Sequence, residues 1–578
     1  MADGIPFAKQ KPIKFAILCE QIADRNEKRQ TSPESQLELD IYRLAHVLFD
    51  KYDDEFSLGL SASQKSKFAD RIRRDRLSHF WSMLIQERHP EIAGMAEDVT
   101  DERQALMLLT SHHLAAACRQ LGDSGDLYLS TMIAQLDEAD DSLRHEMAEQ
   151  IHAWRNQNII SEMSEPIRAL YELIAGNTTV SHGNTQGPFE HRASTFTISE
   201  RFGLDWMQAF GLCLWYGKAK NGTVQDIVQE FASKLARDEE SAKPYSGGQA
   251  GGRHEHPLWV LLQLYAATKG EAKDAPTLPL ALSPLVQSFD NRIAFQLHHA
   301  LVANIPTISI ETSLADKLAV DLAFELSASG ASTAAVFVLM HLSDGPLREF
   351  HIRNLLDRHG RSLPQLFDRT ISETGTTHPD WLFLVGRLKI PDIWIANAKA
   401  LYYRSLNEHF HELKYLIRGD QWEDAHECFS RRVAPRAVIE EDWELIVATA
   451  DLFGKRIQNH VSDWSTGGGM YSDFVAFLVE EVKRTKNSGD QDESASSGEQ
   501  GVTKDQAAQE SVSRIMRLQS SLAEVAHSFK TRGSHLTAGG FDDELEQRVA
   551  CHEMARILTD VMVERQLVSI LQPSMLNA

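Results

Sequence analysis

The chain has 578 residues, of which 42% are hydrophobic and 24% are charged, and its formal net charge at pH 7 is -23. This composition is typical of a folded protein, and the length is several times that of one compact domain, so we expect an extended or multi-lobed body. The acidic excess disfavours direct binding to nucleic acid or to an anionic membrane, because both carry negative charge.

The first 36 residues show little periodicity and predict an extended lead-in. Their apolar stretch, from Ile13 to Cys19, is too short for a signal core or a membrane span. Helical spacing starts near Leu37 in LELDIYRLAHVLF. The basic cluster RIRRDR at 71–76 could contact an acidic partner, but on a helix we favour a solvated face.

Helical hairpins follow in chain order. Helices over 103–121 and 127–136 flank one turn, and a second pair flanks SDGP at 343–346. The clearest hairpin covers 387–429, where Gly419 and Asp420 separate two helices that each carry one apolar face. Such pairs bury these faces only against neighbouring pairs, so the predicted fold class is all-α, a helical solenoid with protein-binding surfaces.

Other segments predict connections. Polar, glycine-rich loops are expected at 176–188 and 237–257, and the strand-like runs at 194–199 and 307–313 are short enough to be connections. The tract 486–510 has almost nothing to bury and predicts a disordered linker. Helical spacing resumes after it and predicts a helical tail.

The five cysteines are far apart and form no CxxC pair, so we expect neither a disulfide framework nor a zinc knuckle, and we expect a reducing compartment. Cys118, Cys213 and Cys428 lie inside apolar helical patterns. A free cysteine in that setting usually acts as a small core residue, so we assign them no redox role.

Two kinds of fragment imitate catalytic loops. GDSG at 122–125 occurs around some serine nucleophiles, but its helical flanks favour a tight turn between helices. The glycine clusters at 247–252 and 467–469 lack the lysine and serine of a phosphate-binding loop and the strand before it.

Two further fragments imitate zinc sites. The triplet HEH at 254–256 lies in a glycine-rich segment without a second cluster at ligand-like spacing, so we favour a solvent-exposed loop. His411 and Glu412 begin a pattern like HExxH, but Tyr415 occupies the position of the second histidine.

The strongest enzyme candidate is the DDxxE motif formed by Asp542, Asp543 and Glu546 on a predicted helix. All-α prenyl-diphosphate enzymes use such carboxylates to hold Mg²⁺ against a diphosphate. Only about thirty residues follow, too few for the rest of such a bundle, so we favour an acidic first helical turn. An all-α Mg-dependent enzyme using Asp542 and Asp543 stays as the weaker alternative.

Four separated sequence blocks, in this order along the chain, resemble a known family. They are DWMQAFGLCLWYG at 205–217, AAVFVLMHLSDGPLREFHIRNLLDRH at 334–359, LKIPDIWIANAKA at 388–400 and DQWEDAHECFSRRVAPRAVIEEDWELI at 420–446. The chain resembles, from about Leu37 to its end, the scaffold nucleoporin of the Y-shaped nuclear pore coat complex. That family is the carboxy-terminal product of the self-cleaving nucleoporin precursor, called nucleoporin ninety-six in vertebrates, and the chain is similar to its fungal form.

The resemblance implies a J-shaped α-helical solenoid of the ancestral coatomer element type, shared with vesicle-coat subunits. Its expected parts are an extended lead-in at 1–36 as the remnant of a propeller-inserting segment, ascending trunk helices at 37–98, a crown at 99–285, descending trunk helices at 286–452 and a helical tail at 453–578. The implied location is the nuclear pore complex at the nuclear envelope, and the implied role is structural support of protein and mRNA transport.

The partners implied by the resemblance are a related helical nucleoporin on the crown, further Y-complex subunits at the tail, and a small β-propeller coat subunit. The propeller contact is in doubt, because the chain resembles a truncated form in which IKFAIL offers at most one strand. No residue matches the catalytic residues of the precursor's autoproteolytic domain. The chain is therefore expected to be no enzyme and to need no cofactor or metal.

Physical reasoning from the residues leads to the same class of protein. An acidic stack of helices without a convincing catalytic or metal-binding motif is best explained as a binding scaffold. Trp206, Phe210, Leu214 and Trp215 are candidate anchors for a partner, because aromatic residues are common in interface hot spots. Their one-face helical spacing favours packing in the core instead. Besides a structural nucleoporin, a vesicle-coat or tethering subunit of the same architecture stays open.

Overall fold

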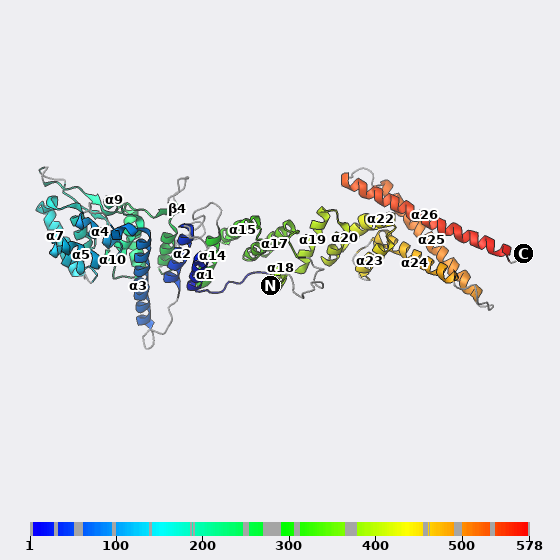
Figure 1. The fold of residues 1–578 in the computed structure, drawn as a ribbon, viewed down its shortest axis with the longest axis horizontal. Coiled ribbons are helices and arrows are strands. Elements are labelled where there is room, and N and C mark those ends of the chain that lie inside the picture. The colour runs from blue at the N-terminus through cyan, green and yellow to red at the C-terminus, as the bar shows by residue number, and fades with distance from the viewer. Residues whose placement is uncertain are drawn as a thin grey trace. The chain divides into compact units, whose positions relative to one another are not determined.

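Nearly all described elements of the computed structural model are helices, so the predicted all-α helical solenoid is confirmed (Figure 1). The chain divides into two compact units. The amino-terminal unit comprises 8–328 and 341–343, and the carboxy-terminal unit comprises 1–7, 329–340 and 344–578. The structure describes residues 4–27, 33–50, 62–94, 100–137, 141–184, 188, 191–246, 254–269, 291–305, 312–364, 379–454, 461, 463–489, 500–531 and 538–575.

The amino-terminal unit is built from helices that pack pairwise against their neighbours in sequence, with α2 also contacting α12 and α14 from much later in the chain. Its α-helices are α1 (Phe15–Glu27), α2 (Pro33–Phe49), α3 (Ala62–Arg88), α4 (Asp101–Thr110), α5 (Leu114–Asp123), α6 (Leu127–Ala134), α7 (Asp141–Asn156), α8 (Glu165–Ile174), α9 (Ile198–Phe202), α10 (Trp206–Tyr216), α11 (Val224–Ala236), α12 (Pro257–Lys269), α14 (Arg292–Asn304) and α15 (Thr312–Ala328).

Short turns and strands complete this unit. Two 3₁₀ segments are η2 (Pro90–Gly94) and η3 (Ile159–Glu162). β1 (Val180–Ser181) pairs antiparallel with β2 (Phe196–Thr197), and β3 (Tyr245–Ser246) pairs antiparallel with β4 (His254–Glu255). The run 194–199 therefore contributes one strand of a two-residue ladder, whereas most of 307–313 lies outside the described residues.

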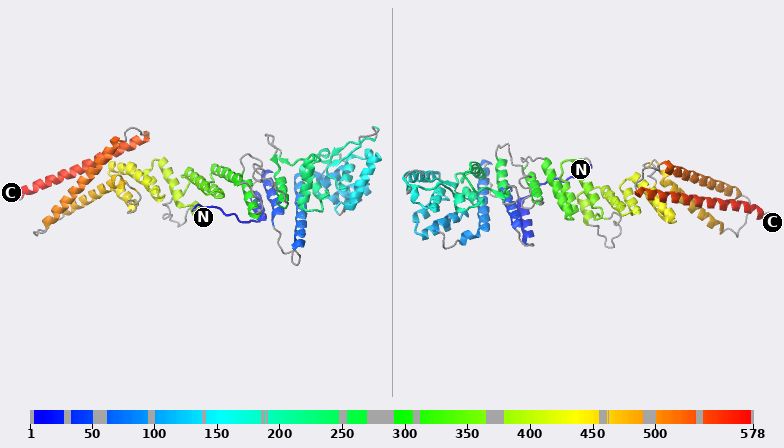
Figure 2. Two further views of the ribbon diagram at one scale, coloured as in Figure 1. Left: turned by 180° about the vertical axis from the view of Figure 1, so that it is seen from behind. Right: turned by 90° about the horizontal axis from the view of Figure 1, so that it is seen from above.

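The carboxy-terminal unit contains further hairpins and the longest helices of the chain, among which α25 and α26 pack side by side (Figure 2, orange to red). Its elements are α16 (Ser332–Leu339), α17 (Gly345–Arg358), α18 (Pro379–Trp381), the π-helical turn η6 (Leu382–Arg387), α19 (Asp392–Ser405), α20 (His409–Arg418), α21 (Trp422–Cys428), the π-helical turn η7 (Phe429–Val433), α22 (Ala434–Ile439), α23 (Trp443–Phe453), the 3₁₀ turn η9 (Trp464–Thr466), α24 (Gly468–Gly489), α25 (Gln500–Thr531) and α26 (Ala538–Met575).

The predicted extended lead-in contains a helix, α1, and the expected strand IKFAIL is therefore wrong. Asp50, at the end of α2, accepts hydrogen bonds from the backbone N–H of Phe15 (2.9 Å) and of Ala16 (3.1 Å). Two of the unpaired N–H groups that every helix start exposes are thereby satisfied by a side chain from another helix. The start of α1 therefore depends on a contact with Asp50, which is distant in sequence, and the residues around Phe15 alone could not predict it.

The predicted helix at 103–121 consists of two helices, α4 and α5, because the chain breaks between Thr110 and Leu114. His112 has a φ of 64°, a left-handed conformation that ends a helix. Its ring stacks on that of Trp215 with 4.8 Å between centroids, so packing against α10 stabilises the break.

The predicted disordered linker at 486–510 is helical where the structure describes it. α24 extends to Gly489 and α25 begins at Gln500, while 490–499 lie outside the described residues. The side chain of Arg514 on α25 forms an ion pair with Glu480 on α24 at 2.5 Å, so the helices that flank the gap contact each other. The polar composition of this tract therefore predicted less helix than α24 and α25 contain.

Candidate interaction surfaces

The four candidate anchors lie on α10, which is buried along its whole length. Trp206, Phe210, Leu214 and Trp215 expose 6%, 0%, 3% and 5% of their surface. α10 is surrounded by α3, α4, α8 and α11, and Asp205 caps its start through a reciprocal capping box with Gln208. Within this unit the four side chains pack in the core, and each exposes at most 6% of its surface.

Aromatic contacts explain this burial. The ring of Trp81 on α3 lies 5.8 Å from that of Trp206 and 4.8 Å from that of Phe210, both in edge-to-face geometry. The indole N–H groups also have partners: Trp81 donates to the carbonyl of Met207 at 2.8 Å, and Trp215 donates to the hydroxyl of Ser78 at 2.8 Å. Trp81 and Ser78 of α3 and the aromatic residues of α10 therefore hold the two helices together.

The basic cluster at 71–76 is used partly for internal contacts, so the predicted solvated face is wrong for two of its arginines. Arg73 donates to the hydroxyl of Tyr265 on α12 at 3.1 Å, and Arg74 donates to the backbone carbonyl of Lys220 at 3.1 Å. Both contacts join α3 to segments that come about 150 or more residues later. A helical-wheel argument could not have found partners so far along the chain.

The GDSG segment comprises the last two residues of α5 and the turn that leads to α6, so the predicted turn is present. Gly125 has a φ of 92°, which favours glycine, and the hydroxyl of Ser124 donates to the carbonyl of Leu121 at 2.9 Å. Asp126 caps α6 by accepting from the N–H of Leu129 at 3.0 Å. The serine hydroxyl is thus used at the end of a helix.

The HEH triplet is not the solvent-exposed loop that we expected. His254 and Glu255 form β4, and His256 is 8% exposed, with its ring 5.0 Å from that of Trp206. Its Nδ1 accepts from the N–H of Leu258 at 3.3 Å, and burial lowers the pKa of His256 to about 3. The glycines that suggested a loop, at 247–252, lie outside the described residues.

The DDxxE motif begins close to the start of α26. The carboxylate of Asp543 accepts from the Nε of Arg432 at 2.9 Å, and the side chain of Asp542 lies outside the described residues. A guanidinium at this distance neutralises the carboxylate and opposes a Mg²⁺ ion there. Gln547, one turn further, donates to the carbonyl of Ser430 at 2.9 Å. This face of α26 docks onto the π-helical turn η7.

A buried ion cluster, which was not predicted from the sequence, surrounds Glu412. The carboxylate of Glu412 is fully buried and contacts Arg404 at 2.5 Å, His409 at 3.0 Å and Arg432 at 3.7 Å. Burial raises the pKa of Glu412, but hydrogen bonds from His409 and Arg404 outweigh that effect and lower the pKa relative to an ordinary glutamate. The available signal was a charged residue directly before Leu413, on the same side of α20 as the apolar Leu416.

This cluster also has the donor types of a metal site. One ligand atom each of His409, Glu412 and Cys428 lies within 4.8 Å of the other two. However, the two arginines already share the carboxylate, and burial raises the pKa of the Cys428 thiol and keeps it protonated. Tyr415, which replaced the second histidine of the zinc motif, stacks on Tyr403 at 5.4 Å. The arrangement is an ion-pair network.

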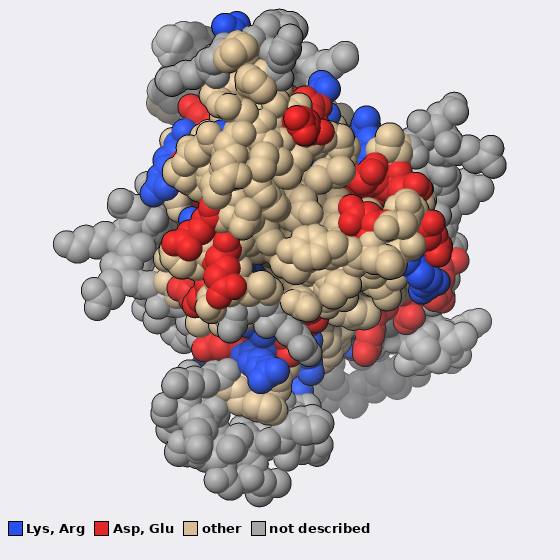
Figure 3. Space-filling view, turned by 90° about the vertical axis from the view of Figure 1, so that its left-hand side faces the viewer, with Lys and Arg blue, Asp and Glu red and all other residues tan. Residues whose placement is uncertain are grey.

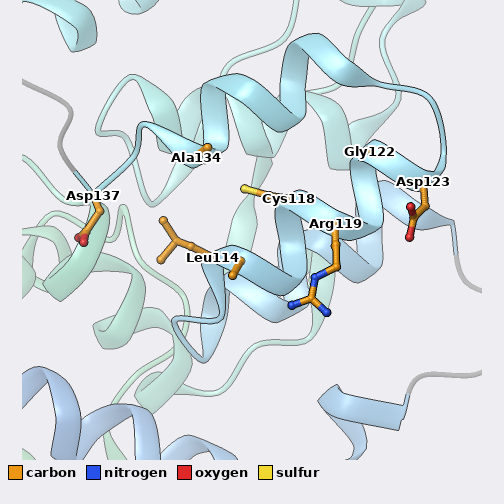
Figure 4. Close-up of a pocket in the computed structure, with 8 residues that line it drawn as sticks. Leu114, Cys118, Arg119, Gly122, Asp123, Ala134 and Asp137 are labelled. Carbon is orange, nitrogen blue, oxygen red and sulfur yellow. The ribbon is translucent and has the colours of Figure 1, made fainter.

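A groove of about 760 Å³ lies between α5 and α6. Figure 4 shows Leu114 and Cys118 pointing from α5 toward the side of Ala134 and Asp137, while Arg119 and Asp123 point outward. The polar side chains diverge, so no point in the groove is approached by a nucleophile, a base and an oxyanion donor together. Its apolar floor suits contact with another protein better than chemistry.

The end of the amino-terminal unit that carries α5 and α7 presents a broad area without charged side chains, bordered by acidic groups (Figure 3). On α6, Leu127 and Tyr128 are 69% and 61% exposed. An uncharged centre with a charged border is the usual anatomy of a protein interface.

All five cysteines are free thiols, as predicted. Cys213 and Cys428 are buried, as expected for core residues, but Cys118 is half-buried and lines the groove between α5 and α6. Burial raises the pKa of Cys213 to about 12. Among the described residues, no helix combines the length and apolar character needed to cross a membrane.

The fold and these surfaces define an all-α protein of stacked helical hairpins whose described charged clusters are mostly paired internally. A family model named "Nuclear protein 96" matches residues 103–402. The chain therefore belongs to the Nuclear protein 96 family, whose nucleoporins reside in the nuclear pore complex at the nuclear envelope, and the predicted resemblance is confirmed.

Three curated relatives illustrate the relationship. Nucleoporin NUP145 of Chaetomium thermophilum is 31% identical over 397 residues, which are 68% of this chain and 20% of that protein. Nucleoporin nup189 of Schizosaccharomyces pombe is 26% identical over 76% of this chain and 24% of the relative. Nuclear pore complex protein Nup98-Nup96 of Drosophila melanogaster is 24% identical over 64% of this chain and 18% of the relative. The chain thus spans about a fifth of the length of these relatives.

Proposed function

We propose that the chain is a structural scaffold subunit of the nuclear pore complex. It binds neighbouring coat nucleoporins through helical surfaces and helps to build the Y-shaped coat that supports nucleocytoplasmic transport. The observation that carries the proposal is the family match over 103–402 on a chain of stacked helices. The J-shaped course of trunk, crown and tail, with crown at 99–285 and tail at 453–578, belongs to the same proposal.

The crown surface supports a helical partner. The groove between α5 and α6 has an apolar floor. Leu127 and Tyr128, in the first turn of α6, are exposed and follow the groove residue Asp123 closely in sequence. Burying such side chains under a partner helix would remove apolar area from water, at about 25 cal/mol per Å². We therefore infer that a related helical nucleoporin covers this groove, and that further Y-complex subunits bind the tail helices.

A β-propeller partner is less well supported. The segment expected to insert a blade contacts the chain's own helices: Arg348 donates to the carbonyl of Pro6 at 2.8 Å, and Asn304 donates to the carbonyl of Ile13 at 2.8 Å. A propeller would have to displace these hydrogen bonds.

We also infer that the chain acts without catalysis, a cofactor or a metal. Among the described residues, the carboxylates that suggested chemistry, Glu412 and Asp543, are paired with arginines. Family membership points the same way, and it distinguishes a nucleoporin from a vesicle-coat or tethering subunit of equal architecture. A Mg²⁺- and diphosphate-dependent rise in melting temperature would contradict this inference.

Size-exclusion chromatography tests the proposal. The chain should co-elute with a helical Y-complex nucleoporin and should not co-elute with a vesicle-coat subunit. A double variant, Leu127→Asp with Tyr128→Asp, should weaken the complex by more than about tenfold, because two charges would have to be buried. Val447→Asp, at an apolar residue of α23 that is 42% exposed, is the matched control. Co-elution with the vesicle-coat subunit alone would overturn the proposal.

A further inference from the structure

The groove between α5 and α6 has a carboxylate at each end. Asp123 is the last residue of α5, and Asp137 follows the end of α6. Because a tight turn joins the two helices and they pack side by side, the two carboxylates lie at opposite ends of the groove, as Figure 4 shows. Both side chains are exposed, and among the described residues neither forms an ion pair. Each end of the groove can therefore accept a cationic group from outside.

The surroundings of the groove are acidic as well. Residues 114–162 contain no lysine and three arginines, whereas Asp or Glu stands at nine positions: 123, 126, 137, 138, 140, 141, 146, 149 and 162. Figure 3 shows acidic groups along the border of the uncharged area at this end of the unit. The field around the groove therefore attracts a basic partner and repels an acidic one.

Most cations near the groove are already engaged with backbone or acidic groups. Arg144 is 6% exposed and donates to the carbonyl of Gly217 at 2.7 Å, and Arg155 lies 4.0 Å from Glu172. Lys220 is 7% exposed, and its ammonium donates to the carbonyls of Leu136 at 2.6 Å and Asp137 at 3.2 Å. It offsets part of the charge at that end without reaching the surface.

One exposed cation remains on the groove itself. Arg119 lies between the two ends and points outward from α5 (Figure 4). The three charged side chains that line the groove thus comprise one guanidinium and two carboxylates, and the carboxylates occupy the ends.

The floor of the groove has room for an opposing helix. Ala115, Cys118, Gly122 and Ala134 line it, and side chains this small leave space for larger apolar side chains from a partner. The lining on α5 runs over 114–123. At 1.5 Å per residue this stretch is about 15 Å long, which equals about three helical turns.

We propose that this groove binds one basic amphipathic helix, about three turns long, of the partner nucleoporin. The inference rests on the proposed function, in which a helical nucleoporin covers the groove. Large apolar side chains of the bound helix fill the space above the small residues of α5, in the helix-in-groove mode. A lysine or arginine at each end of this helix pairs with Asp123 and with Asp137, and the two ion pairs fix its register along the groove.

A direct binding measurement with the full chain tests the proposal. The probe is a fluorescein-labelled, end-capped 14-residue peptide with a leucine stripe at helical spacing and one lysine near each end. One control peptide has glutamates in place of the two lysines, and a second control carries both lysines in the middle of its polar face. By fluorescence anisotropy, we expect the probe to bind at least about tenfold more tightly than the glutamate peptide and about threefold more tightly than the second control.

Variants of the chain locate the site. The double variant Asp123→Lys with Asp137→Lys should reverse the preference, so that the glutamate peptide binds better than the probe. Glu524→Lys with Glu564→Lys, at exposed residues of α25 and α26, changes the net charge equally and should leave the preference unchanged. Ala115→Trp, at an exposed residue of the floor, should weaken the probe at least about tenfold because the indole fills the groove.

Co-elution with a helical Y-complex nucleoporin separates this inference from the proposed function. If the chain co-elutes with that nucleoporin but the charge-reversed variant and Ala115→Trp bind it and the probe as tightly as the unmodified chain, this inference is wrong and the scaffold role stands. If the chain does not co-elute but binds the probe selectively, the scaffold role is wrong and the groove still binds a basic helix. Equal binding of all three peptides, or no binding, would overturn the inference in either case.

Discussion

Arg292 on α14 donates two hydrogen bonds to the carboxylate of Glu38 on α2, although 254 residues separate them in sequence. The distances are 2.6 and 2.9 Å, and Arg25 on α1 donates to the same carboxylate at 2.5 Å. Only 4% of the Glu38 side chain is exposed. One buried carboxylate therefore joins a helix near the beginning of the chain to a helix that comes much later in it.

Replacing Glu38 by alanine should lower the free energy of unfolding of the amino-terminal unit by about 3 kcal/mol, because two arginines lose a shared buried partner. Urea unfolding at pH 7.5 measures the change. Glu149→Ala removes a carboxylate that is 71% exposed and forms an ion pair with His145 on the same helix, and it should cost less than about 0.5 kcal/mol. Equal losses in both variants would show that the contact between α2 and α14 does not depend on Glu38.

The hairpins could be predicted from the sequence because their signals are local. Gly419 and Asp420 were expected to separate two helices, and α20 does end at Arg418 while Asp420 adopts a φ of 55°. Similarly, Asp344 caps α17 and Pro346 lies in its first turn. The apolar spacing, the helix-breaking residues and the capping residue all lie within a few positions of each other. The start and end of each helix can therefore be predicted from the local sequence alone.

Elements with distant partners could not be predicted. α1 begins where Asp50 caps it, and the break at His112 is held by Trp215, more than a hundred residues away. The π-helical turn η7 likewise places Arg432 between Glu412 and Asp543. Such contacts depend on the tertiary arrangement, whereas composition and periodicity describe only the local chain.

The burial of Phe210 makes a strong prediction about the core. Phe210→Ala should lower the free energy of unfolding by about 4 kcal/mol, because its fully buried ring packs against Trp81, Phe231 and Trp259 and would leave a cavity. Thermal and urea unfolding measure this. The control Leu127→Ala, at a side chain that is 69% exposed, should change stability by less than about 0.5 kcal/mol. A Phe210→Ala variant of unchanged stability that fails to bind a partner would instead favour the interface role.

His298 should make stability depend on pH between 7.5 and 5. Burial lowers the pKa of His298 from 6.5 to about 4, its side chain is 4% exposed, and its Nδ1 has no hydrogen-bond partner among the described residues. The unfolded chain therefore binds a proton below pH 6.5 that the folded chain binds only near pH 4, so stability is present above pH 6.5 and falls as the pH drops. The loss at pH 5 is about 2 kcal/mol.

Comparison with His298→Leu isolates this contribution. Burial raises the pKa of Glu172 and of Glu240, and these groups gain protons more readily in the folded state, so they partly offset the histidine in the unmodified chain. The unmodified chain should lose about 2 kcal/mol more than His298→Leu between pH 7.5 and 5 in urea unfolding. Parallel pH profiles for the two proteins would show that His298 is protonated with its ordinary pKa.

The ion cluster at Glu412 should control the docking of α26. Glu412→Gln leaves Arg404 and Arg432 without their buried carboxylate and should lower the free energy of unfolding of the carboxy-terminal unit by about 3 kcal/mol. Asp543→Asn removes a half-buried partner of Arg432 and should cost about 1 kcal/mol, with faster amide hydrogen exchange near residues 543–551. Urea unfolding and hydrogen exchange with mass spectrometry measure both effects.

Asp560→Asn is the control for this experiment, because its carboxylate is 64% exposed and pairs with Arg556 on the same helix. It should leave stability and exchange unchanged within about 0.5 kcal/mol. Zn²⁺ should not raise the melting temperature of the unmodified chain, since two guanidinium groups oppose a cation between His409 and Cys428. A Zn²⁺-dependent rise that Glu412→Gln abolishes would mean that these side chains exchange their arginines for a metal ion.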